Sequence, residues 1–265
     1  MNRTGTVIAA AALFCGLLAG GRGKALAGHP LGTEDAETQG EGNVEVEFNV
    51  ERLHGNDGTR TTSPGNFITV GIAPKLDLAV GYACDFTRES DGTSSRRMGP
   101  VDATIKRVFT GGEKRYPALG IKAGVSFPTA EGEQAALLAT AIGEGSFGPT
   151  TVFANVGAIV GTNLAGNAEK STSIRASIAG SREFREEWYL LAELLWEKRV
   201  TPSAASSGEW LIGGKKEISE ALSVNGGIRW GIAGDSPHVT YLLGLTYGYR
   251  GNPPVPAATP VRGAR

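Results

Sequence analysis

The chain has 265 residues, a formal net charge of −1, 20% charged residues and 40% hydrophobic residues. A charge balance this close to zero gives no electrostatic reason to expect nucleic-acid binding, and the composition excludes both a disordered polymer and a bundle of membrane helices. The 39 glycines favour many turns and kinked strands over long helices.

Residues 1–27 have the pattern of an export signal peptide. A positively charged start precedes the apolar run Val7–Ala19, which is shorter than the roughly 20 residues of a membrane-spanning helix. Ala25–Ala27 fits a small-x-small cleavage site, so the mature chain is expected to begin at Gly28. Cleavage after Gly21 and retention of the segment as a membrane anchor are the alternatives.

The mature sequence is a succession of short stretches in which apolar and polar residues alternate. In Asn43–Leu53, valines and Phe48 occupy one face of an extended chain and glutamates occupy the other, as expected for a strand. Residues 135–143 fit a helix equally well. The predicted strands lie near 43–53, 65–73, 76–86, 99–109, 117–127, 135–143, 150–161, 171–182, 188–199, 207–218, 222–232 and 238–249. About 12 strands, each of roughly 9–11 residues, predict an all-β fold with a single antiparallel up-and-down transmembrane β-barrel over residues 43–249.

The lengths of the connections assign the two ends of this barrel. Outer-membrane barrels have short turns on the periplasmic side and longer loops outside. The tight connections at 73–75, 184–187 and 219–221 all fall on the side that holds both chain ends. We therefore expect residues 28–42 to form an N-terminal periplasmic segment, and the proline-rich residues 250–265 to form a flexible periplasmic tail.

The predicted outward faces suit lipid. Strand 188–199 carries Trp188 and Trp196 at the ends of an aliphatic stripe, roughly 26 Å apart along a strand. A tilt of about 40° leaves roughly 20 Å along the membrane normal, which matches the apolar band between two aromatic girdles. A soluble barrel or sandwich also alternates, but mid-strand charges opposite long apolar stripes favour the membrane barrel, and with it the bacterial outer membrane as location and its lipid as partner.

The predicted inward faces carry charges of both signs. One interpretation is a lattice of salt bridges that fills the lumen, and the other is a lining that selects solutes by charge. A barrel of this size lies between filled and open barrels, so the choice stays open, with the lattice favoured. The candidate lumen-lining residues are Glu45, Glu47, Lys106, Lys122, Arg175, Glu193, Glu197 and Arg229, together with Glu51, Asp77, Asp85 and Asp102.

Five short stretches follow one another along most of residues 29–249: His29–Asn43, Gly71–Gly81, Gly120–Thr129, Ser219–Arg229 and Leu243–Tyr249. In this order and spacing the chain resembles a family of outer-membrane transporters named for the phenol-degradation meta-pathway. The resemblance implies a single barrel and uptake of small, often apolar or aromatic compounds, and it implies no catalytic residues. The chain departs from a typical barrel in continuing to Arg265 instead of closing on a terminal aromatic, which puts assembly through the usual C-terminal recognition by the barrel-assembly machinery in doubt.

Catalytic and cofactor sites are not expected. His29, His54 and His238 have no metal-ligand spacing, and Ser236 with His238 is the one adjacent pair that a membrane-embedded hydrolase could use. The sequence therefore predicts a passive transporter or channel for an unknown small-molecule solute, without enzyme activity. The alternatives are a non-conducting structural or surface barrel, a membrane-embedded hydrolase, and a soluble ligand-binding β-domain.

Overall fold

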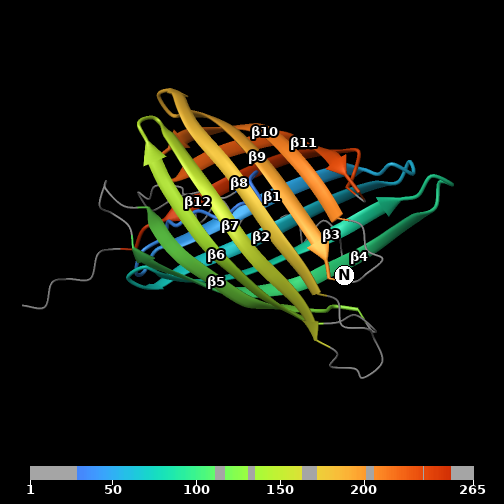
Figure 1. The fold of residues 1–265 in the computed structure, drawn as a ribbon, viewed down its shortest axis with the longest axis horizontal. Helices are drawn as coiled ribbons and strands as arrows, with labels where there is room; N and C mark the ends of the chain where they lie inside the picture. The colour runs from blue at the N-terminus through green and yellow to red at the C-terminus, as the bar shows by residue number, and fades with distance from the viewer. Residues whose placement is uncertain are drawn as a thin grey trace, which may run out of the picture.

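The computed structural model describes residues 29–110, 117–130, 135–162, 172–200, 206–234 and 236–251. Twelve antiparallel strands form one closed barrel (Figure 1). The predicted signal peptide and most of the predicted tail lie outside the described residues. The strands are Val44–His54 (β1), Arg60–Ala73 (β2), Leu76–Arg88 (β3), Ser94–Thr110 (β4), Ala118–Phe127 (β5), Ala135–Phe147 (β6), Thr150–Thr162 (β7), Thr172–Arg185 (β8), Trp188–Arg199 (β9), Ser206–Ser219 (β10), Leu222–Ala233 (β11) and Val239–Tyr249 (β12).

Each strand pairs with its neighbours in sequence, and the barrel closes between the first strand and the last. Val44 lies opposite Val70 on β2 and opposite Tyr249 on β12. Closure leaves no strand edge unpaired, which a protein surrounded by lipid requires. The predicted all-β, up-and-down barrel is confirmed.

Two predicted strands differ from those observed in instructive ways. The helical alternative for residues 135–143 is wrong, because β6 pairs along its length with β5 and β7 and continues to Phe147. β4 begins at Ser94, five positions before the predicted start, since it pairs with β3 as far as Arg88. The β3–β4 hairpin consequently extends past the rim of the barrel (Figure 1).

Short turns join the strands at the end that holds Val44 and Tyr249. Pro74-Lys75 and Glu186-Glu187 are two-residue turns, and Lys75 and Glu187 have positive φ angles of 58° and 65°. Such angles match the twist of tight hairpins. We call this end the turn end and the opposite end, with the longer connections, the loop end.

The outer wall of the barrel is apolar. Leu243 is 66% exposed, and Trp188 and Trp196 are 41% and 40% exposed near the two ends of β9. At the turn end the ammonium group of Lys216 lies 4.8 Å from the Trp188 ring centroid, a contact suited to a membrane interface. In the part of the chain that the structure describes, no helix is long and apolar enough to cross a membrane.

Candidate functional site

The N-terminal segment, residues 29–43, lies inside the barrel. The structure differs from the prediction of a separate periplasmic stretch at residues 28–42. At the turn end the Gly42 amide donates to the Gly71 carbonyl, and the Gly71 amide donates to the Asn43 carbonyl. From there the segment crosses the lumen. Its members contact side chains of β3, β4, β5, β6, β7, β9 and β11. The segment is stable inside the barrel because inward polar side chains of these strands form hydrogen bonds with its backbone.

Backbone amides of the N-terminal segment donate to oxygens of the wall. Four amides do so, each to a different strand: Thr33 to Glu193 at 2.6 Å, Glu34 to Asn155 at 2.6 Å, Ala36 to Glu144 at 2.8 Å and Gln39 to Asp77 at 3.0 Å. A non-strand segment inside a barrel has no ladder partner, so its amides need acceptors of this kind. The wall therefore holds the segment through its main chain.

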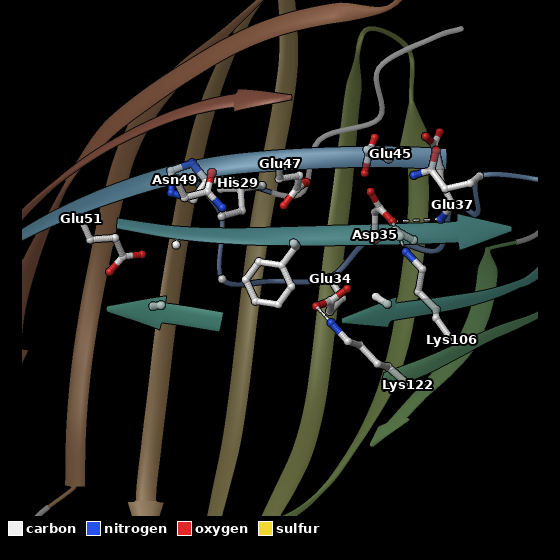
Figure 2. Close-up of a pocket in the computed structure, with 18 of the residues that line it drawn as sticks. His29, Glu34, Asp35, Glu37, Glu45, Glu47, Asn49, Glu51, Lys106 and Lys122 are labelled. Atoms are coloured by element: carbon white, nitrogen blue, oxygen red, sulfur yellow. Dashed lines mark hydrogen bonds and ion pairs between the residues drawn. The ribbon is translucent and has the colours of Figure 1, made fainter. Parts of the chain in front are cut away.

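Two ion pairs join the N-terminal segment to β4 and β5. The Lys106 ammonium lies 3.0 Å from the Asp35 carboxylate, and the Lys122 ammonium donates to Glu34 (Figure 2). Burial alone would raise the pKa of Glu34, but the positive charges of Lys122 and Lys106 outweigh it and lower the pKa. The carboxylate is therefore ionised at neutral pH and its pairing with Lys122 is maintained.

The first residue of the segment fits a recess in the wall. His29 Nδ1 lies 2.6 Å from Asn225 Oδ1, and a Cβ on Gly244 would come within 2.5 Å of this imidazole nitrogen and 2.8 Å of Asn49 Oδ1. A side chain at position 244 would therefore displace the ring. Burial lowers the pKa of His29, so the imidazole is neutral at pH 7.

Glu193 is one of three inward carboxylate residues that the wall encloses almost fully, with Glu45 and Asp77. Its residue is 5% exposed. One carboxylate oxygen accepts from the backbone and hydroxyl of Thr33, and the other lies 3.8 Å from Arg229. A buried carboxylate needs such partners to offset lost hydration. Arg229 also lies 3.6 Å from the Glu209 carboxylate.

The other predicted lumen residues lie as follows. Arg175 on β8 and Glu197 on β9 form a pair at 2.6 Å toward the loop end. Glu45, Glu47 and Glu51 follow one another along β1 and line a cavity (Figure 2). Asp85 accepts from Ser63, and Asp102 lines a second cavity.

Two cavities flank the N-terminal segment. The first, of about 440 Å³, lies against β1–β5, and the second, of about 430 Å³, extends over β4–β11. Gly32, Glu34, Phe67 and Lys122 line both. The segment therefore stands between the two cavities and divides the lumen.

Several important residues were not predicted. Glu34 and Asp35 belong to the segment for which the sequence predicts a periplasmic location. Glu144 lies one position beyond the predicted end of its strand at residue 143. Lys106 and Lys122 could have indicated acidic partners. The sequence predicts both as inward cations on neighbouring strands, where like charges are stabilised by nearby carboxylates. Asn155 and Asn225 carry no charge that the alternation argument would single out.

Ser236 has a structural arrangement in place of a catalytic one. Its oxygen accepts from the Gly208 amide at 2.9 Å, and its one hydroxyl proton is shared between the carbonyls of Gly208 and Ala233, whose oxygens lie 2.8 and 2.7 Å from the hydroxyl oxygen. Its bonds go to backbone atoms rather than to the His238 ring, so the geometry does not favour the hydrolase alternative. Among the described residues, no three His, Cys, Asp or Glu side chains are grouped to hold a metal ion.

Comparison with known proteins identifies the fold. No protein-family model matches the sequence, and a search of curated proteins finds no match. An outer membrane channel from Pseudomonas putida F1 has a TM-score of 0.64 at 13% identity, over 81% of this chain and 97% of that one. The NanC porin has a TM-score of 0.58 at 5% identity, over 77% and 98% of the two chains. The β-domain of the Bordetella autotransporter BrkA has a TM-score of 0.52 at 13% identity, over 79% and 100%. The fold and the apolar outer wall are those of a bacterial outer-membrane protein, as predicted.

Proposed function

We propose that this protein is a passive outer-membrane channel for small molecules, and that the N-terminal segment narrows its lumen. The observation that carries the proposal is the reach of the first cavity beside the segment. Its lining includes Glu45 near the turn end and Glu51 farther toward the loop end, about 20 Å apart along β1 at about 3.3 Å per residue. A space of this length on one side of the segment supports a solute route past it.

The side chains that line this route support the passage of small solutes that can move along a partly polar wall. Glutamates of β1 line one side of the first cavity, and Phe67, Ala79 and Ala83 line another. Rings of acidic side chains favour cations over anions, while the apolar side offers contact to an uncharged solute. The sequence resemblance to the phenol-degradation meta-pathway transporters supports apolar or aromatic compounds as the solute class, and membership of that family is part of the proposal.

Planar-bilayer recordings of the purified barrel test the proposal. We expect discrete conductance steps in symmetric potassium chloride, and a reversal potential in a salt gradient that indicates preference for potassium over chloride. Swelling of proteoliposomes in a small phenol, compared with a disaccharide of larger cross-section, reports the size limit. A correctly folded barrel that gives no steps and no swelling would reject the channel and favour a non-conducting structural barrel.

A further inference from the structure

Four exposed arginines gather on the outer wall of β1–β4 near the loop end. They are Arg52 on β1, Arg60 on β2, Arg88 on β3 and Arg96 on β4. This is the part of the barrel where the β3–β4 hairpin extends past the rim (Figure 1). We call these residues the arginine patch.

Strand register brings the four side chains together on the lipid-facing side. Arg60 and Arg88 are directly opposite each other across β2 and β3. Arg52 lies opposite the exposed Tyr241, and Arg96 lies opposite the exposed Phe86. Directly opposite residues share one face of a sheet, so Arg52 and Arg96 point outward. Arg88 lies two positions after the exposed Phe86 on β3 and shares its face, and Arg60, opposite Arg88, points the same way. Adjacent strands are about 4.8 Å apart, so the patch is about 14 Å wide over four strands.

The patch lacks acidic partners. Within the described residues, none of its four arginines forms an ion pair. The Arg96 guanidinium lies 5.4 Å from the centroid of the Phe86 ring. Like charges directly opposite each other destabilise a sheet. An arrangement of this kind is favourable when an anion lies between the cations.

The level of the patch identifies the anion. Toward the middle of the barrel the same outer surface becomes apolar, with Val50, Leu243 and Met98 exposed. Arginine stems lie along such a surface while their guanidinium groups reach the headgroup level. At that level the anions available to an outward face are lipid phosphates, whose geometry a guanidinium matches through two parallel hydrogen bonds.

We propose that the arginine patch binds the phosphate groups of a phosphorylated glycolipid in the outer leaflet. The inference rests on the outer-membrane location and the loop end facing outward, and it holds whether or not the lumen conducts. Each arginine at a charged membrane surface contributes about a fivefold gain in affinity. The patch would fix the rotational position of the barrel by holding lipid at one sector of its wall.

The test compares two double variants of the full chain, folded in detergent. R60Q/R88Q removes the opposed pair of the patch, and R107Q/R182Q removes two exposed outer-wall arginines at the turn end. Binding of bisphosphorylated lipid A is measured by the shift in melting temperature as lipid is titrated. We expect R60Q/R88Q to bind about 25-fold more weakly and R107Q/R182Q to bind as the native protein does.

Three results would overturn the proposal. One is equal affinity of the native protein and R60Q/R88Q for lipid A. Another is equal binding of lipid A with and without its phosphates. The third is an equal shift with inorganic phosphate alone, which would mean an anion site that does not recognise lipid. If R60Q/R88Q does not fold, R52Q/R96Q provides the same comparison from the other two members of the patch.

Discussion

Lys106 and Lys122 occupy directly opposite positions on β4 and β5, and both point into the lumen. Two like charges in this relationship repel each other. Asp35 and Glu34, consecutive residues of the N-terminal segment, each take one of the lysines. The barrel wall and the segment are therefore electrostatically complementary, and each is less stable without the other.

Removing the two acidic partners should release the segment. E34Q/D35N leaves the two lysines facing each other, and we expect a loss of roughly 1–3 kcal/mol, below that of a fully buried pair, because both lysines retain some exposure. The melting temperature should fall, and ion selectivity should shift toward anions. E41Q changes an exposed residue of the same segment and should alter neither quantity. An unchanged melting temperature in E34Q/D35N would mean that these pairs do not hold the segment in place.

A methyl group at Gly244 should displace the start of the segment. In G244A the new Cβ would lie within 2.5 Å of both His29 Nδ1 and Asn225 Oδ1, so the imidazole must leave its recess. Limited proteolysis should then cut the N-terminal segment faster in G244A than in the native protein. G180A is the matched control, because its new Cβ would meet no atom closer than 3.9 Å. Equal cleavage of both variants would contradict the recess.

The lipid-facing and lumen-facing sides of the wall should respond differently to a new charge. Leu243 is 66% exposed on the outer wall, and L243R should cost roughly 2–4 kcal/mol of barrel stability in a bilayer. Thr69 lines the first cavity, and T69R should cost less because its guanidinium reaches water and the carboxylates of β1. Folding titrations with urea in lipid vesicles measure both. Similar losses for the two variants would show that the faces are assigned wrongly.

The ion pairs of Arg229 and Arg175 in the lumen should contribute differently to the stability of the barrel. Arg229 has a 14% exposed side chain and stands between Glu193 and Glu209, whereas the Arg175 side chain is 58% exposed beside Glu197. R229Q leaves Glu193 short of a cation and should lower the melting temperature clearly, while R175Q should change stability by less than about 1 kcal/mol. Both should increase cation preference, since each removes a positive charge from the lumen. A larger loss of stability in R175Q would reverse this ranking.

The strands were predictable because lipid on one side and water on the other impose a strict alternation on each of them. β1 carries it from Val44 to Glu51, and β9 carries it apart from the inward Leu191 and Leu195. β6, rich in alanine and leucine, fits a helix equally well until its pairing with β5 and β7 is known. The inward direction of Lys106 and Lys122 followed from the same alternation. Their direct opposition did not, because register across a hairpin depends on a bulge between Val108 and Thr110.

The position of the N-terminal segment could not be foreseen in the same way. Residues 29–43 have no periodicity, and the wall binds them largely through backbone amides, which every sequence has. The acceptors Glu193, Asn155, Glu144 and Asp77 come from four strands that meet only when the barrel closes. A segment of charged and small residues ahead of the first strand is equally compatible with a location outside the barrel.

Single-channel conductance of the native protein and of a variant lacking residues 29–39, in planar bilayers under the same salt, tests the central claim most directly. The deletion leaves the Gly40–Asn43 turn that bonds to Gly71, and heat-modifiable migration in gels verifies that both barrels are folded. We predict small steps for the native protein and steps several-fold larger for the deletion variant, because the two cavities then merge into one lumen. Equal conductance of the two folded proteins would contradict the claim that the N-terminal segment narrows the channel.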